Sequence, residues 1–187
     1  MTATPSGLPD LELVARAKAG DRAAFSALVA RHYDYIYRVA YRWAGARDEA
    51  EDVAQEACVR LSKAIFRFEG ASAFTTWLYA LTLNVARDLT RKRRSESRKA
   101  DAYAVHALAL GEAEEDPADD PAAALWAAVR RLPDKQREAV TLVYGEEKSH
   151  SEAADLMGCA EATVSWHIHE AKKRLKALMR PAGDDAP

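Results

Sequence analysis

The sequence predicts an all-α protein, with two small helical domains joined by an acidic linker. First, apolar residues recur every three or four positions along most of the chain, which is the period of a helix with one buried face. Second, glycine, proline and capping residues separate these stretches, as is typical of helix ends. Third, an acidic segment interrupts the pattern, so the expected parts are residues 8–97, the linker 98–120 and residues 121–180.

Composition and charge restrict the function classes. With 187 residues, 49% of them hydrophobic, the chain can bury one medium core or two small ones. The net charge of −2 argues against a uniformly basic nucleic-acid binder, but acids and bases are segregated along the chain, so local charge matters more. There is no apolar run of membrane-spanning length and no signal-peptide pattern. We therefore expect a cytoplasmic protein without membrane insertion.

Neither a metal site nor a catalytic site is expected. Cys58 and Cys159 lie far apart and outside any CxxC pattern, and His167 and His169 would point in different directions on a helix. The sequence has no P-loop, no zinc-protease helix motif and no nucleophile paired with a base at a recognisable spacing. We expect no metal, no cofactor and no enzymatic activity.

Three helices are expected before the first aromatic loop. Asp10 is placed to cap the first, which ends at Gly20, and Asp21 is placed to cap the second, which Gly45 ends. The third begins at Asp48, and its outer face is dense in acids. The polar positions on the first half of that face are Glu49 and the five residues that we call the acidic-face residues, namely Asp48, Glu51, Asp52, Gln55 and Glu56. The helix dipole explains part of this pattern, but the density favours docking on a basic protein surface.

A loop rich in aromatic residues precedes the longest expected helix. The loop consists of Phe66, Arg67, Phe68, Glu69, Gly70, Ala71 and Ser72. The helix begins at Phe74, and its apolar stripe, including Trp77 and Leu81, is expected in the core. Another face carries Asn84, Arg87 and Arg91 and ends in a basic cluster that includes Lys92. The loop is suited to hold an unstacked base beside a helix that holds phosphates; the alternative is an ordinary solvated basic surface.

The acidic linker has two interpretations. Its acids, among them Glu112, Glu114, Glu115 and Asp116, occur where the sequence has no Lys or Arg between Lys99 and Arg130. It is either an inert, solubilising tether or a strand that mimics a polyanion in a basic channel of a partner.

A helix-turn-helix is expected in the second domain. A helix beginning at Pro121 is followed by one capped by Asp134, and the capping box of Ser149 and Glu152 opens a short helix. Gly158 makes the turn into a long helix over residues 161–179. The positions of that helix expected to face outward are Thr163, Ser165, Trp166, His169, Glu170, Lys172 and Lys173. Such a face suits a reader of the DNA major groove; the alternative is an ordinary helical hairpin.

Through four of these stretches the chain resembles an RNA polymerase sigma factor of the extracytoplasmic-function (ECF) group. The stretch that resembles the clamp-docking helix of sigma region 2 is DEAEDVAQEACVRL, and the stretch that resembles its promoter-melting part is FTTWLYALTLNVARDLTRKRR. The stretches that resemble the region 4 helix-turn-helix are LPDKQREAVTLVY and SHSEAADLMGCAEATVSWHIHEAKKRL. The four motifs occur in the order of the family, and the resemblance covers nearly all of residues 10–180.

The resemblance implies a non-enzymatic initiation factor for a stress response, with core RNA polymerase, promoter DNA and an anti-sigma factor as partners. It assigns the five acidic-face residues from Asp48 to Glu56 to the polymerase clamp. It assigns the aromatic loop and Asn84 to the flipped base of the minus-ten element, and Arg87, Arg91 and Lys92 to the DNA backbone. It assigns the outward face of the last helix to the minus-thirty-five element. Ser165, Trp166 and His167 depart from the family's usual Lys-Ser-Arg, so we expect an individual minus-thirty-five sequence.

The sequence leaves two alternatives to an ECF sigma factor open. A stand-alone helix-turn-helix regulator would bind duplex promoter DNA without polymerase. A sigma-like decoy would bind an anti-sigma factor and never bind DNA, although the basic run from Arg87 to Arg94 disfavours it.

Overall fold

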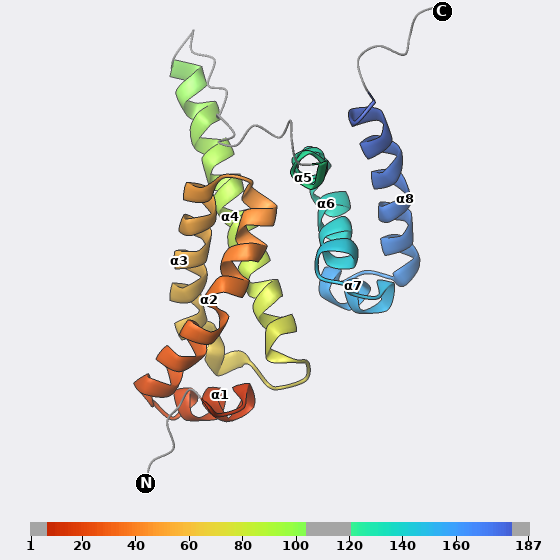
Figure 1. The fold of residues 1–187 in the computed structure, drawn as a ribbon. Helices are drawn as coiled ribbons and strands as arrows, with labels where there is room; N and C mark the ends of the chain where they lie inside the picture. The colour runs from red at the N-terminus through yellow and green to blue at the C-terminus, as the bar shows by residue number, and fades with distance from the viewer. Residues whose placement is uncertain (1–6, 104–120, 181–187) are drawn as a thin grey trace, which may run out of the picture. The chain divides into compact units, whose positions relative to one another are not determined.

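The computed structural model describes residues 7–103 and 121–180, and every regular element within these ranges is a helix (Figure 1). The chain divides into two compact units, Met1–Glu112 (unit 1) and Ala113–Pro187 (unit 2). The prediction of an all-α fold with two helical domains is confirmed.

Unit 1 is a bundle in which α2 packs against α1, α3 and α4. Its elements are α1 (Asp10–Lys18), α2 (Arg22–Ala44), α3 (Arg47–Ala64), the 3-10 helix η2 (Ile65–Arg67) and α4 (Phe74–Tyr103). In Figure 1, α2, α3 and α4 run alongside one another. Leu28 and Ile36 of α2, Leu61 of α3, and Leu78 and Val85 of α4 are fully buried, and they form the core that holds the three helices together.

The ends of the first helices follow the expected chemistry with one exception. The Asp21 side chain accepts hydrogen bonds from the backbone N–H groups of Ala23 and Ala24, and Gly45 ends α2 in the left-handed region with φ 87°. The prediction that Asp10 caps α1 is wrong, because Asp10 lies inside the first turn. Its carboxylate contacts Arg31 at 2.7 Å and His32 at 2.9 Å, which ties α1 to α2. Although burial raises the pKa of Asp10, these hydrogen bonds hold it below its ordinary value.

The buried face of α4 differs from the predicted stripe. Phe74 is buried as expected, but Trp77 and Leu81 are only half-buried, while Tyr79 and Leu83 are buried in addition. The reason is that α4 packs against both α2 and α3, so its buried side is broader than a single stripe and is centred away from the predicted one, which leaves Trp77 and Leu81 only half-buried. Helix α4 continues through Tyr103, so the first residues of the segment 98–120 are helical. The rest of that segment, with its run of acids, lies outside the described residues.

Unit 2 contains the helix-turn-helix. Its elements are α5 (Pro121–Arg130), α6 (Asp134–Val140), the π-helix η3 (Thr141–Gly145), α7 (His150–Met157) and α8 (Glu161–Leu178). Helix α8 packs against α6 and α7 through the buried side chains of Val164, Ile168 and Ala171. The capping box of Ser149 and Glu152 is present at the start of α7. The prediction that Asp134 caps α6 is wrong, because Asp134 is the first residue inside the helix and follows Pro133 at the cap position.

The turn between α7 and α8 leaves one helix end without a side-chain cap. Gly158 ends α7 in the left-handed region with φ 62°, which glycine adopts without a steric cost. The next helix begins after Ala160, whose backbone is extended but whose methyl group cannot accept a hydrogen bond.

Replacing Ala160 by serine is expected to raise the free energy of unfolding by about 1 kcal/mol, because a serine oxygen can accept a hydrogen bond from the first turn of α8. Thermal unfolding of the full chain measures this gain. Ser149→Ala, which removes a cap already present, serves as the opposite control and should lower the unfolding temperature. An unchanged or lower unfolding temperature for Ala160→Ser would show that the first turn of α8 has no need of a cap.

Candidate functional site

The five acidic-face residues of α3 lie along two edges of the helix. Asp48, Glu51 and Gln55 are exposed and follow the spacing of one outward edge. Asp52 and Glu56 lie on the neighbouring edge, which faces α4. The structure therefore brings the five residues together on one helix but gives them two different environments.

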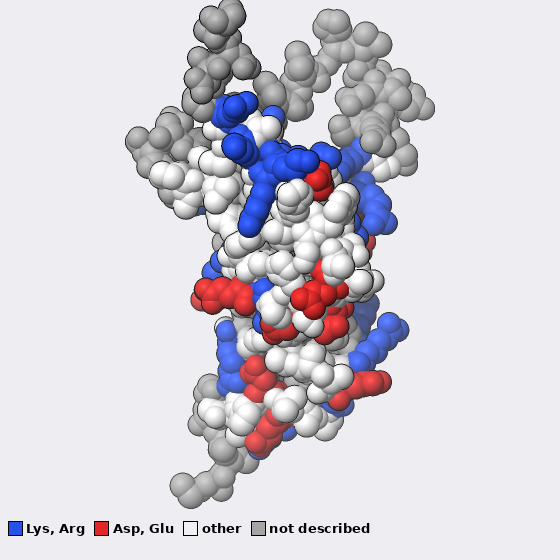
Figure 2. All heavy atoms as spheres, turned by 90° about the vertical axis from the view of Figure 1, so that its right-hand side faces the viewer, with Lys and Arg blue, Asp and Glu red and all other residues white. Residues whose placement is uncertain are grey.

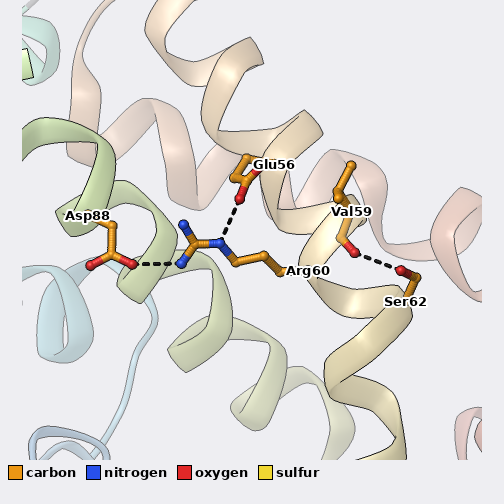
Figure 3. Close-up of polar contacts among 5 residues, drawn as sticks. All are labelled: Glu56, Val59, Arg60, Ser62 and Asp88. Atoms are coloured by element: carbon orange, nitrogen blue, oxygen red, sulfur yellow. Dashed lines mark hydrogen bonds and ion pairs between the residues drawn. The ribbon is translucent and has the colours of Figure 1, made fainter. Parts of the chain in front are cut away.

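Ion pairs connect the second edge of α3 to α4. Arg93 of α4 donates a hydrogen bond to Asp52 at 2.6 Å and contacts Glu49 at 3.0 Å. Further along α3, Arg60 donates one hydrogen bond to Glu56 of the same helix at 2.7 Å and another to Asp88 of α4 at 2.6 Å (Figure 3). Two of the acidic-face residues, Asp52 and Glu56, are thus paired with arginines, which sequence spacing does not reveal.

The second half of α3 continues the outward edge with less polar residues. Val59 is exposed, and the Ser62 hydroxyl donates to the Val59 carbonyl at 2.7 Å (Figure 3). Ser62 and Phe66 line an open cavity of about 410 Å³ between the α1–α2 turn and the end of α3, together with Ala17 and Phe25. Phe66 therefore lies on the side of unit 1 where the α1–α2 turn and the end of α3 meet.

The aromatic loop is anchored by Phe68. This side chain is only 4% exposed, and its ring lies 5.5 Å from that of Phe74 and 5.3 Å from that of Trp77. Lys18 of α1 donates a hydrogen bond to the Phe68 carbonyl, which fixes the loop to the rest of unit 1. The other predicted residues of the loop, Phe66, Arg67, Glu69, Gly70 and Ser72, are exposed.

The outward face of α4 begins with Trp77 and continues through exposed Asn84 and Arg91 at seven-residue steps. Lys92 is exposed beside it. Arg87 differs, because it is half-buried and its guanidinium lies 5.7 Å from the centre of the Trp43 ring. The partial exposure of Trp77 was not predicted from the sequence, because its position fits the apolar stripe as well as the outward face.

The predicted DNA-reading residues of α8 share one side of unit 2. Ser165, Trp166 and His169 are exposed, and Trp166 reaches 56%. The residues half-buried among them are Thr163 and Glu170. Two side chains on this face contact residues that precede α8. Ser165 forms a hydrogen bond with His150 of α7 at 2.9 Å, and the Lys172 ammonium lies 5.4 Å from the centre of the Tyr144 ring.

Cations follow on the second half of α8. Lys172, Lys173, Arg174 and Lys176 are all exposed, and Lys173 contacts Glu170 at 3.5 Å. Figure 2, viewed from the side on which Figure 1 draws α8, shows a dense group of lysine and arginine side chains near the top of the view, with acidic and further basic side chains mixed below it. The four exposed cations on the second half of α8 suit a helix whose first half reads bases and whose second half meets phosphates.

Neither a metal-binding group of side chains nor a membrane-spanning helix occurs among the described residues. Within residues 7–103 and 121–180, no three His, Cys, Asp or Glu side chains are grouped to hold a metal ion. None of the helices described is long and apolar enough to cross a membrane.

Comparisons with known proteins decide the family. The Sigma-70 region 2 family matches residues 28–96, and the Sigma-70 region 4 family matches residues 122–175. The chain is 34% identical to the RNA polymerase sigma-H factor of Pseudomonas aeruginosa, over 92% of this chain and 94% of that protein. It is 30% identical to the ECF RNA polymerase sigma factor SigW of Bacillus subtilis, over 89% and 95%. The chain belongs to the ECF sigma factors.

Solved structures of relatives agree with this family. CnrH, in complex with the cytosolic domain of CnrY, matches this sigma factor with a TM-score of 0.63 and 26% identity, over 91% of this chain and 96% of that one. RpoE of Bartonella quintana, in complex with the anti-sigma factor NepR, matches with a TM-score of 0.64 and 25% identity, over 83% and 96%. The resemblance noted from the four motifs is confirmed, as is the prediction of a non-enzymatic initiation factor.

The geometry of α8 in this sigma factor gives a prediction about salt dependence. Lys172→Ala is expected to weaken binding of the holoenzyme to all promoters alike and to reduce the slope of log affinity against log salt by roughly 0.9, the value for one lost phosphate contact. Trp166→Ala is the contrast, because a base-edge contact should change sequence preference and leave the salt slope unchanged. Titrations at several salt concentrations on two unrelated promoters separate these effects. A Lys172→Ala loss confined to one promoter would mean that Lys172 reads sequence.

Proposed function

We propose that this protein binds core RNA polymerase in the cytoplasm and directs it to a small set of promoters. The observation that carries the proposal is that both sigma regions occur in order, each with an exposed face of the chemistry its task needs: acidic on α3, aromatic and cationic on α4, and mixed on α8. In this proposal residues 8–97 dock on polymerase and melt the minus-ten element, residues 98–120 connect the domains, and residues 121–180 recognise the minus-thirty-five element.

The polymerase contact is assigned to the acidic face of α3. Asp48, Glu51 and Gln55 offer their side chains directly on the outward edge. Asp52 and Glu56 take part as well, with Arg93 and Arg60 beside them. A face of this charge fits a basic surface on the clamp of the polymerase, where opposite charges speed and orient docking.

The minus-ten contact is assigned to the aromatic loop and the outward face of α4. Exposed loop residues and Asn84 hold the unstacked base, and half-buried Trp77 adds an aromatic surface on which a base can stack. Phe68 supports Trp77 from inside the unit. Arg91 and Lys92 meet the DNA backbone, and Arg87 contributes through its charge from its place beside Trp43.

The minus-thirty-five contact is assigned to α8. Ser165, Trp166 and His169 reach base edges in the major groove, together with Thr163 and Glu170 at the border of the face. Lys172 and Lys173 hold phosphates. Because a bulky, exposed Trp166 stands on this face, contact with a thymine methyl group is a natural means of discrimination.

An anti-sigma factor is proposed as a further partner. The support is that the solved relatives CnrH and RpoE of Bartonella quintana were each found in complex with another protein, which for RpoE is the anti-sigma factor NepR. Such a partner would hold this protein inactive until a signal releases it.

Binding to core polymerase tests the proposal. The purified full-length chain should co-elute with core RNA polymerase in size-exclusion chromatography, and the complex should retard promoter DNA that neither component retards alone. Retardation of duplex DNA by the chain alone would instead identify a stand-alone helix-turn-helix regulator. Absence of any complex with core polymerase would contradict the proposal.

A further inference from the structure

Arg60 lies between an acid of the proposed docking face and an acid of the proposed DNA-binding helix. Its Nε donates to Glu56 Oε1 at 2.7 Å within α3, and its Nη1 donates to Asp88 Oδ2 at 2.6 Å on α4 (Figure 3). The two carboxylates approach different nitrogens of one guanidinium, which its forked geometry permits. We call Glu56, Arg60 and Asp88 the triad.

The triad has one positive and two negative charges, so Arg60 cannot neutralise both acids fully. The side chains are partly open to solvent, with exposed fractions of 37% for Arg60, 38% for Glu56 and 49% for Asp88. External partners can therefore reach each acid. A guanidinium shared in this way shifts toward one carboxylate when the other is neutralised or removed.

Asp88 lies where its negative charge would oppose the binding of DNA. It lies one turn from Asn84 and one turn from Lys92 on α4, among the residues assigned to promoter DNA. An uncompensated carboxylate there repels phosphates, and the contact with Arg60 offsets that repulsion. Glu56, at the other end of the triad, belongs to the residues assigned to polymerase.

We propose that Arg60 is a positioning residue that couples polymerase docking to engagement of promoter DNA through the Glu56–Arg60–Asp88 triad. When a cation of polymerase pairs with Glu56, Arg60 is released toward Asp88 and cancels its repulsion of DNA. By linkage, DNA near Asp88 draws Arg60 away from Glu56 and leaves that acid more attractive to polymerase. This inference rests on the proposed function.

The coupling predicts an effect at a distance from the mutated residue. In Asp88→Asn, Arg60 stays with Glu56, so affinity for core polymerase should fall about fivefold, although Asp88 is not on the docking face. In the Arg60→Gln background the same Asp88→Asn change should leave polymerase affinity unaltered, because the connection is already broken. The matched control is Glu96→Gln, which removes one acid from α4 that contacts Lys92 rather than α3.

Fluorescence titration of the labelled full-length chain with core polymerase measures these affinities, and circular dichroism confirms the fold of each variant. If Arg60→Gln does not fold, Arg60→Lys takes its place, since an ammonium keeps the charge but loses the fork. The proposal is overturned if Asp88→Asn binds polymerase as the wild type does, or if its loss is equal in both Arg60 backgrounds. Failure of the wild type itself to bind polymerase would instead refute the proposed function.

Discussion

Replacing Glu51 and Gln55 together by lysine is expected to abolish binding to core RNA polymerase, with a loss of about 100-fold or more, because two cations would then face the basic surface that docks there. Both residues are exposed on the outward edge of α3, so the helical fold should be unaffected. They are better targets than Asp52 and Glu56, whose reversal would also break the contacts with Arg93 and Arg60.

A matched control exists on α2. Ala30 and Asp34 are exposed, four residues apart, and their replacement by lysine adds the same charge to unit 1. Titration of each double variant with core polymerase, alongside circular dichroism, compares the two faces. If the α2 pair lowered the affinity as much as the α3 pair, general charge rather than the α3 face would be responsible, and the docking assignment would be wrong.

Replacing Asn84 by alanine is expected to reduce formation of the open promoter complex by about 5- to 150-fold, which corresponds to one base contact of about 1 to 3 kcal/mol. Asn84 is exposed on the outward face of α4, and a base can reach it only after leaving the stack. Initial binding to the closed promoter should therefore remain near that of the wild type.

Two readouts distinguish these steps. Permanganate reactivity of unpaired thymines reports the open complex, and band retardation at low temperature reports the closed one. Ser95→Ala, another polar truncation at an exposed position of α4, should change neither. Equal losses of closed and open complexes in Asn84→Ala would show that Asn84 acts in overall binding rather than in holding a flipped base.

Local signals in the sequence located most of the helix ends. Asp21, Gly45 and the Ser149–Glu152 box act through neighbouring backbone groups, so a few residues suffice to predict them. Asp10 carries the same local signal, but its carboxylate is used by Arg31 and His32, more than twenty positions away. A capping residue can thus serve a tertiary contact instead, and nothing in its immediate sequence indicates this.

The candidate site was predictable in its residues but not in their environments. Spacing placed five polar residues on the outer face of α3, yet only the packing of α3 on α4 determines that Asp52 and Glu56 have arginine partners. Spacing also placed Trp77 in the core, because a helix packed on two sides buries a face that a single stripe does not define. The apolar residues of the aromatic loop follow no regular spacing, so the sequence does not predict that Phe68 is buried and Phe66 exposed; tertiary packing determines both.

Transcription in a minimal system tests the central claim most directly. Core RNA polymerase, the full-length protein, nucleotides and a library of templates with randomised upstream DNA are incubated, and the templates of the resulting RNAs are sequenced. We expect RNAs that start at defined positions downstream of two shared sequence elements, and none of these RNAs with core polymerase alone. RNAs whose templates share no upstream elements, or no increase in RNA when the protein is added, would contradict the conclusion that it directs polymerase to promoters.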